Sequence, residues 1–354
     1  MMLTRRALSK AALAAPAIAL AMPALAAARP KPIVIAHRGA SGERPEHTLA
    51  AYRLAIAEGC DFIEPDLVVT RDGALVVRHE NEISGTTDVA AHAEFAARRT
   101  TKVVDGERLT GWFVEDFTLA ELKTLRARER LPQLRPGNTA YDGQDAIPTF
   151  QEVIDLAKAE SRRTGRVIGV YPEMKHPAFL SAAGLPPEAR LADALKANGW
   201  HGADAPVFIQ CFEVGPLKTI ARLCDAPRVQ LVSDEGGPAD LPGVRYADMI
   251  TADGLKAVAA YAQGLGPAWS QILPTGADGA LAAPTRLVAD AHAAGLKVHP
   301  WTVRAENAFL PPALRRGTDP AAHGDVQAVL KALYAAGVDG LFSDFPGLAV
   351  QARG

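Results

Sequence analysis

The amino-acid sequence predicts an α/β fold, a (β/α)8 barrel of the TIM type with an insertion after its second strand. Short β-branched apolar runs alternate with longer Ala- and Leu-rich patterns of helical spacing, which is typical of a parallel sheet with helices around it. About eight such units follow one another over roughly 330 residues, the number that closes a barrel. A doubly wound open sheet is the alternative, but no Gly-x-Gly-x-x-Gly pattern follows the first strand.

The first elements can be placed from the spacing of their apolar residues. Residues 33–36 are predicted as the first strand, and residues 45–58 as a helix. A second strand opens at residues 62–63. The turn-forming residues 71–73 then predict a hairpin with residues 75–77.

The second half of the chain repeats the alternation of strands and helices. We expect strands at residues 167–171, 207–210, 229–232, 264–266 (the weakest), 297–301 and 340–342. We expect helices at residues 150–160, 188–197, 214–223, 255–261, 285–294 and 325–336. Gly295 and Gly337 directly follow two of these helices, as helix-terminating glycines commonly do.

Residues 84–148 do not fit the alternation. They are polar and rich in turn-forming residues, with one helical stretch near residues 119–126. We expect them to form an insertion that folds over one end of the barrel, because a loop of this length is usually functional. The basic run at residues 126–130 is interpreted as a solvated helix end. Residues 233–245, rich in Gly and Pro, are predicted as a surface loop.

Residues 1–26 have the pattern of a signal peptide. Arg5 and Arg6 begin a basic region, an Ala- and Leu-rich stretch follows, and residues 24–26 form a small-x-small cleavage site. The arginine pair predicts a twin-arginine export signal, and an ordinary secretory signal is the alternative. In both cases we expect the mature chain, residues 27–354, to be a soluble periplasmic or secreted protein without stable membrane insertion, since no other segment approaches about 18 uninterrupted apolar residues.

Composition excludes several classes of protein. The 354 residues contain 38 Lys and Arg against 40 Asp and Glu, so the formal net charge of −2 lacks the basic excess of a nucleic-acid-binding protein. Cys60, Cys211 and Cys224 are too few for a disulfide scaffold or a Cys-rich zinc module. At most one disulfide can form, and we expect buried free thiols.

Three carboxylates follow predicted strands at the end where barrel active sites lie. Glu64 and Asp66 are two residues apart and so point to the same side of their strand, and Glu173 follows the next one. At about 5 Å and an effective dielectric of about 20, each pair would repel by roughly 3 kcal/mol. We therefore expect Glu64, Asp66 and Glu173 to bind a divalent cation. An all-oxygen ligand set suits Ca²⁺ or Mg²⁺ rather than zinc, and we expect Ca²⁺ ahead of Mg²⁺.

Positive and titratable side chains accompany these carboxylates. Arg38 and Lys175 supply positive charge for an anionic group such as a phosphate. His37 and His79 supply an acid and a base that titrate near neutral pH. Two histidines, a divalent cation and phosphate-binding cations together point to cleavage of a phosphodiester.

At these residues the sequence resembles the glycerophosphodiester phosphodiesterase family. The matching motifs are His37-Arg38-Gly39-Ala40-Ser41-Gly42, Pro45-Glu46-His47-Thr48-Leu49, Glu64-x-Asp66, His79, Pro172-Glu173-Met174-Lys175, Gln210-Cys211-Phe212, His299-Pro300-Trp301-Thr302-Val303 and Gly340-Leu341-Phe342-Ser343-Asp344. They cover nearly all of the mature chain in the family's order.

The resemblance implies a (β/α)8 barrel that converts glycerophosphodiesters, such as glycerophosphocholine, to sn-glycerol 3-phosphate and an alcohol. It implies that Glu64, Asp66 and Glu173 bind the metal and that His37 and His79 are the catalytic acid/base pair. Substrate would be bound by Arg38 and Lys175 at the phosphate and by Trp301 at the glycerol.

Three positions depart from the family pattern. Glu80 follows His79 where the family commonly has Asp, which puts the orientation of His79 in question. His47 stands where Asn is frequent, and Cys211 where Ser is often found.

Two other functions stay open from the sequence alone. A lysophospholipase D or a phospholipase C-like enzyme would share the barrel and the histidine chemistry but would need an apolar groove for an acyl chain. A non-catalytic exported binding protein is the third reading, although a binding module needs no acid/base pair of histidines. The leaving alcohol and the oligomeric state cannot be read from the sequence.

Overall fold

The computed structural model describes residues 30–354, and residues 32–354 cluster as one unit. The predicted signal peptide, residues 1–26, lies outside the described residues.

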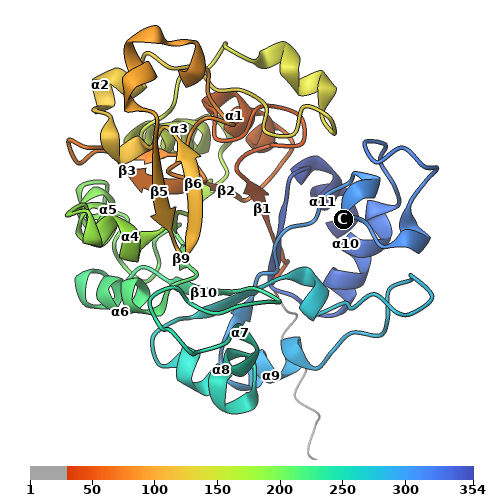
Figure 1. Ribbon diagram of the computed structural model, residues 1–354. Helices are drawn as coiled ribbons and strands as arrows, with labels where there is room; N and C mark the ends of the chain where they lie inside the picture. Colours follow the sequence, from red (N-terminus) through yellow and green to blue (C-terminus); the bar gives the residue numbers. More distant parts are fainter. Residues whose placement is uncertain (1–29) are drawn as a thin grey trace, which may run out of the picture. The chain divides into compact units, whose positions relative to one another are not determined.

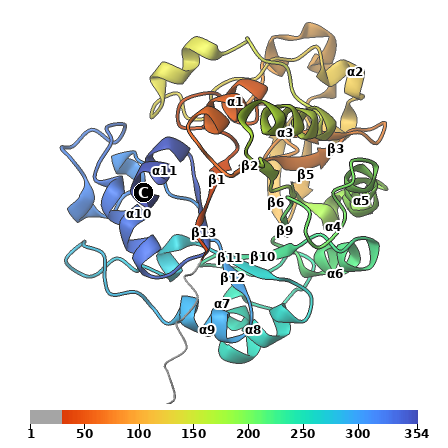
Figure 2. The same cartoon turned by 180° about the vertical axis from the view of Figure 1, so that it is seen from behind.

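Eight strand segments form a ring at the centre of residues 32–354, with helices around it (Figure 1 and Figure 2). Two segments are each interrupted once: Pro65 separates β2 from β3, and Tyr171-Pro172 separates β7 from β8. Proline has no N–H to give to a strand ladder, which explains both interruptions. The strands are β1 (Ile33–His37), β2 (Phe62–Glu64) with β3 (Asp66–Val69), β7 (Gly169–Val170) with β8 (Glu173–Met174), β9 (Ile209–Cys211), β10 (Arg228–Val232), β11 (Gly264–Pro267), β12 (Lys297–Val298) and β13 (Gly340–Ser343).

The pairing of these strands is parallel and follows chain order. One sheet has the order β13-β1-β2-β7 and the other β12-β11-β10-β9-β8-β3-β4, where β4 (Leu75–Val77) is the antiparallel hairpin partner of β3. The ladder of strands is open between β12 and β13, where backbone hydrogen bonds join the neighbouring segments instead. Asp339 N donates to Val298 O and Phe342 N donates to Pro300 O, both at 2.9 Å. The predicted (β/α)8 barrel is thus confirmed.

Helices form the outer layer, and their ends follow local sequence signals. The first helix begins at Leu49 rather than at residue 45, because the Thr48 side chain accepts a hydrogen bond from Ala51 N and caps it. Thr149 and Glu152 make a capping box at the start of α3. The helices are α1 (Leu49–Ala57), α3 (Phe150–Thr164), α4 (Pro177–Ala182), α5 (Pro187–Ala197), α6 (Val214–Leu223), α7 (Tyr246–Met249), α8 (Ala252–Ala259), α9 (Leu287–Ala293), α10 (Val326–Ala335) and α11 (Pro346–Arg353).

Two apolar clusters explain why these elements pack as they do. The larger one lies between the helices and the outer side of the strands and includes Val34, Ile154, Leu217 and Leu330. A smaller cluster consists of Ile35, Tyr171, Val229 and Phe342. These residues come from β1, from the link between β7 and β8, from β10 and from β13. Alternate residues of β1, such as Val34 and Ile35, therefore belong to different clusters, as the period of a strand requires.

The segment between β4 and α3 contains the predicted insertion, residues 84–148, and forms a small apolar core together with Val68 of β3 and Val76 of β4. The core includes Phe95, Trp112, Phe117 and Leu122, all buried. The segment contains the hairpin of β5 (Thr100–Val104) and β6 (Glu107–Gly111), the short helix α2 (Leu119–Leu122) and several turns of 3-10 helix. Figure 1 shows this hairpin in front of the barrel strands, and Figure 2 shows it behind them.

Some predicted strands are longer than the observed ones, and the hairpin of β5 and β6 was not predicted. The predicted strand 167–171 pairs only as β7, because Val167 is exposed and Ile168 N is taken by the Ser161 side chain. The hairpin was missed because its strands are largely exposed, so they lack an alternating apolar face. The predicted helix near residues 119–126 is a single turn, α2.

Three further observations concern the whole described chain. Cys60, Cys211 and Cys224 are buried and free, as predicted. No helix among residues 30–354 combines the length and the apolar character that crossing a membrane requires. Near the end of the chain, Arg353 Nη1 donates to Pro32 O at 2.9 Å and also pairs with Asp61, which ties α11 to the segment that enters β1.

Candidate active site

The polar residues that follow the strands meet around a cavity of about 280 Å³. Its lining includes every predicted site residue except Asp66, namely His37, Arg38, Glu64, His79, Glu173, Lys175 and Trp301. A neighbouring cavity of about 270 Å³ shares Glu173, Lys175 and Phe212 with it. The predicted site residues, which lie far apart in the sequence, are therefore brought together at one site by the fold.

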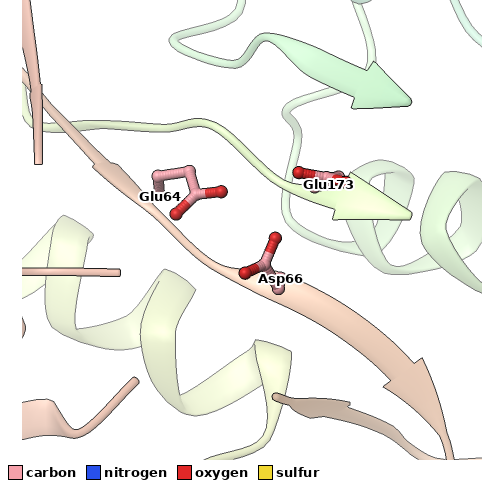
Figure 3. A group of neighbouring side chains, drawn as sticks. All are labelled: Glu64, Asp66 and Glu173. Carbon is pink, nitrogen blue, oxygen red and sulfur yellow. The ribbon is translucent and has the colours of Figure 1, made fainter. Parts of the chain in front are cut away.

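The three predicted metal ligands lie together, with Glu64 as the last residue of β2 and Asp66 and Glu173 as the first residues of β3 and β8. One carboxylate oxygen each of Glu64, Asp66 and Glu173 lies within 4.8 Å of the others, and all three residues are buried (Figure 3). Pro65 is responsible for part of this arrangement, because the strand breaks there and continues with the pairing of Asp66 to Glu173.

Burial and mutual repulsion disturb the titration of these acids. Burial, followed by the charges of Asp66 and Glu173, raises the pKa of Glu64 well above its usual value. Burial likewise raises the pKa of Glu173 to about 8, although Lys175 opposes the rise. Burial would raise the pKa of Asp66 as well, but Lys175 and His79 hold it well below its usual value. The cluster thus holds more negative charge than it can stabilise alone.

The donor set fits a hard divalent cation. Two oxygens, Oδ1 of the cluster residue Asp66 and Oε1 of the neighbouring Gln210, are buried without a hydrogen-bond partner. Lys175 supplies the nearest positive charge, with its Nζ 2.7 Å from Glu173 Oε1 and 3.5 Å from Asp66 Oδ1. Carboxylate and amide oxygens are the ligands that Ca²⁺ and Mg²⁺ prefer, and among residues 30–354 no thiol or imidazole joins the set.

His37, at the end of β1, is held by Asp344 at the end of β13. Its Nδ1 lies 2.6 Å from Asp344 Oδ1. The ionised carboxylate can only accept, so in the neutral ring Nδ1 carries the proton and Nε2 carries the lone pair. Burial, and then the charge of Arg38, lowers the pKa of His37 to about 4, against the opposing effect of Asp344.

His79 has the same arrangement with Glu80, the residue that departs from the family pattern. Nδ1 of His79 lies 2.5 Å from Glu80 Oε1, so the longer acid reaches the ring. Burial, and then the charges of Arg38 and Lys175, lowers the pKa of His79 to about 3. The expectation that these histidines titrate near neutral pH is therefore wrong for the free protein, because burial lowers the pKa of both rings. Both are neutral near neutral pH, with Nε2 able to accept a proton.

Arg38 sits in a left-handed turn that follows β1, with φ of 60°. This turn directs its backbone N–H to Glu64 Oε2, at 2.8 Å, and its guanidinium Nη1 to Glu46 Oε2, at 3.0 Å. Its Nε is buried without a hydrogen-bond partner, 3.5 Å from Asp66 Oδ2. That donor is available to a ligand.

An aromatic wall closes another side of the cavity. The Nε1–H of Trp301 donates to Gly266 O at 2.9 Å, which fixes the ring. The Trp301 ring packs edge-to-face against Phe212, with ring centroids 5.5 Å apart.

The two other departures from the family pattern, His47 and Cys211, are buried. His47 bridges Asp66 Oδ2 and the Tyr52 hydroxyl, both at 2.8 Å, and Cys211 contacts the Met174 carbonyl.

The interpretation of residues 126–130 as a solvated helix end is wrong. α2 ends at Leu122, residues 126 and 127 form isolated β-bridges, and only one residue of the run is exposed. Arg128 is exposed, but the Arg130 guanidinium contacts the carboxylates of Glu46 and Glu80. Arg135 and Asp344 were also not predicted as site residues, although Asp344 belongs to one of the family motifs. Asp344 carried a signal that could have been used, since it follows a strand as the other site residues do; the two arginines carried none, because their partners are distant in sequence.

Comparison with known proteins agrees with this geometry. The model of the glycerophosphoryl diester phosphodiesterase family matches residues 37–348. A glycerophosphodiester phosphodiesterase of Arabidopsis thaliana is 39% identical over 329 residues, 90% of this chain and 84% of that protein. One of Haemophilus influenzae is 32% identical over 346 residues, 90% and 89% of the two chains. Among solved structures, a phosphodiesterase from Oleispira antarctica in complex with the product sn-glycerol-3-phosphate has a TM-score of 0.60 at 24% identity, covering 91% of this chain and 96% of that one.

Proposed function

The chain belongs to the glycerophosphoryl diester phosphodiesterase family, and we propose that it hydrolyses small glycerophosphodiesters to sn-glycerol 3-phosphate and an alcohol by metal-dependent acid/base catalysis. It is a glycerophosphodiester phosphodiesterase, which sets aside the non-catalytic alternative. One observation carries the detailed proposal. Two histidines, each with Nδ1 on a carboxylate, line the same cavity as Glu64, Glu173 and the cation Arg38.

Glu64, Asp66 and Glu173 would hold the divalent cation. The proposal is supported by their mutual distances, by the raised pKa values of two of them, and by the unpartnered oxygens beside them. A cation bound there would polarise substrate oxygens and stabilise negative charge as it develops. Ca²⁺ remains our expectation ahead of Mg²⁺, because three buried carboxylates form a site without the need to keep several waters.

Arg38 and Lys175 would bind the phosphate. Arg38 Nε has no hydrogen-bond partner, and Lys175 needs only to turn from Glu173 once the excess negative charge of the cluster is neutralised. Trp301 would lie against the glycerol moiety, since its ring is fixed in the cavity wall.

His37 and His79 would move the protons. One histidine accepts the proton of the substrate hydroxyl that lies beside the phosphate, and that oxygen forms a bond to phosphorus. The bond from phosphorus to the leaving alcohol breaks, and the other histidine donates a proton to that alcohol. Because both rings are neutral in the free protein, this histidine would take up its proton when the anionic substrate binds. Water then opens the cyclic phosphate with the two proton transfers reversed, which gives sn-glycerol 3-phosphate.

The decisive experiment uses metal-stripped protein. Glycerophosphocholine, glycerophosphoethanolamine, glycerophosphoglycerol and lysophosphatidylcholine are offered separately, and Ca²⁺ or Mg²⁺ is added back. We expect turnover of the first three only after a cation is returned. Undiminished turnover without any cation would contradict the metal dependence. Preferred turnover of lysophosphatidylcholine would favour the lysophospholipase D alternative.

A further inference from the structure

We infer that Arg130 and Arg135, which both belong to the insertion, are positioning residues for the two predicted catalytic histidines. Each arginine binds the carboxylate that holds Nδ1 of one histidine. This inference rests on the proposed function and extends it: the insertion, beyond covering the barrel, fixes the acid/base pair.

Arg130 fixes His79 through Glu80. Its Nη1 and Nη2 donate to Glu80 Oε1 and Oε2 at 2.9 and 2.6 Å, a bidentate contact that holds the carboxylate plane. Glu80 Oε1 is also the atom that holds His79 Nδ1. The ring orientation of His79 therefore depends on a guanidinium that lies 50 residues further along the chain.

Arg130 also reaches the phosphate-binding side of the site. Its Nε and Nη2 donate to Glu46 at 2.7 and 2.6 Å, and the same Glu46 accepts from Arg38 Nη1 at 3.0 Å. Glu46 is buried, and the charges of Arg130 and Arg38 overcome the effect of burial and hold its pKa well below the usual value. Loss of Arg130 should thus disturb both His79 and Arg38.

Arg135 fixes His37 through Asp344. Its Nη2 donates to Asp344 Oδ2 at 2.5 Å, while Oδ1 of the same carboxylate holds His37 Nδ1 at 2.6 Å. Its Nε donates to Glu306 at 2.6 Å and its Nη1 to Ser41 O at 2.9 Å, and the Arg135 side chain is only 6% exposed. A buried guanidinium satisfied on three sides has one geometry available.

The two carboxylates differ in the number of arginines that contact them. Asp344 Oδ2 also accepts from Arg304 Nε at 2.9 Å, so a second cation remains when Arg135 is removed. Glu80, in contrast, has only Arg130 as its arginine partner among the described contacts. Replacement of Arg130 should therefore cost more activity than replacement of Arg135.

The test compares Arg130→Ala and Arg135→Ala with Arg128→Ala as the matched control. Arg128 lies in the same segment, but its side chain is 56% exposed and its nearest acid, Asp142, is 3.6 Å away. With glycerophosphocholine and saturating Ca²⁺ or Mg²⁺, whichever supports the wild type, we expect kcat to fall about 10- to 100-fold in each test variant. The Michaelis constant should rise for Arg130→Ala, through Arg38, and stay near the wild-type value for Arg135→Ala. The control should behave as the wild type.

Two readouts separate positioning from a merely structural role. Millimolar guanidinium, with sodium chloride at the same concentration as reference, should restore part of kcat in the Ala variants and in neither the wild type nor the control. In a second substrate the leaving group is 4-nitrophenolate, which departs without taking up a proton. With this substrate the loss of kcat should be smaller for the arginine that positions the general acid. Arg130→Lys and Arg135→Lys keep the positive charge but cannot make a bidentate contact with a carboxylate. They replace an Ala variant that fails to fold, and their kcat should fall by a smaller factor.

The inference is overturned if folded Ala or Lys variants keep wild-type kcat, if guanidinium restores nothing, or if the losses are the same on both substrates for both arginines. His37→Ala and His79→Ala are measured in the same assay. If those two variants are fully active, the proposed acid/base chemistry is wrong. If they are inactive while the arginine variants behave as the wild type, only the positioning inference falls.

Discussion

At the scale of single residues, the two histidines should be the most sensitive positions of the molecule. Their Nδ1 atoms are occupied by carboxylates, so each presents one nitrogen to the cavity. Acid/base catalysis contributes roughly 10²–10⁴-fold, so His37→Ala and His79→Ala should each reduce kcat by at least that range. The double variant should lose much less than the product of the two losses, because the pair acts as a unit. A folded, metal-loaded His79→Ala protein with nearly full activity would show that the mechanism is wrong.

Glu173→Gln should weaken cation binding and activity together. The substitution keeps the shape of the side chain and removes a carboxyl group that must ionise to bind the cation. The pKa of this group, raised to about 8, shows how costly its ionisation is without the cation. The fold should therefore lose little, because relief of repulsion offsets the lost ligand. Calorimetric titration with Ca²⁺ and thermal melting of the metal-free protein measure the two effects. Cation affinity equal to that of the wild type would remove Glu173 from the ligand set.

The sequence allowed prediction of those site residues that lie at the ends of strands. His37, Glu64 and Glu173 each directly follow or end an apolar run, and parallel strands bring such positions together. Arg130 and Arg135 could not be found in this way. Their roles depend on contacts that span 84 and 209 residues, and no local pattern encodes such contacts.

At the scale of elements, the start of α4 shows how a buried acid can limit stability. Ala178 N, in the first turn of α4, lies 3.1 and 3.3 Å from the two oxygens of Glu213, a residue only 3% exposed. Burial, then the nearby Asp105 and Asp240, raises the pKa of Glu213 from its usual value of 4.5 to about 8. The folded state thus holds a proton that the unfolded chain releases, so the contribution of Glu213 to stability is greatest below pH 4.5 and falls as pH rises towards 8.

Glu213→Gln should remove this loss of stability. Glutamine keeps an oxygen for Ala178 N and never ionises, so the variant should match the wild type near pH 4.5 and exceed it at pH 8.5. Because a cavity borders the carboxyl group and lets solvent screen it, we expect a gain of roughly 1–3 kcal/mol. Urea denaturation at the two pH values measures the difference. A constant difference between variant and wild type across the pH range would mean that folding does not raise the pKa of Glu213.

The predictability of elements followed their burial. α6 was predicted at its observed bounds, because its apolar residues lie on one buried face. The hairpin of β5 and β6 stands mostly in solvent and left no alternating pattern, so it was missed. Bounds of short strands such as β12 depend on which backbone groups find partners, which a sequence pattern does not specify.

At the scale of the whole molecule, we propose that residues 1–26 direct export through the twin-arginine route and that residues 27–354 act in the periplasm or outside the cell. The reason is the pair Arg5-Arg6 ahead of a weakly hydrophobic, Ala-rich stretch. Changing both arginines to lysine should leave the precursor in the cytoplasm, as measured by cell fractionation and blotting. Normal delivery of the double variant would instead point to the ordinary secretory route.

The contact between Arg353 and Pro32 has a consequence for how the ring is specified. Since α11 ends beside the segment that enters β1, a short linker could join the two ends of residues 32–354 and new ends could be opened at the exposed Gly317-Thr318. A circular permutant of this kind keeps every strand neighbour and every partner of the two histidines, and only the order of synthesis changes. It should refold to an active enzyme, because the neighbours of each strand do not depend on where in the chain synthesis begins.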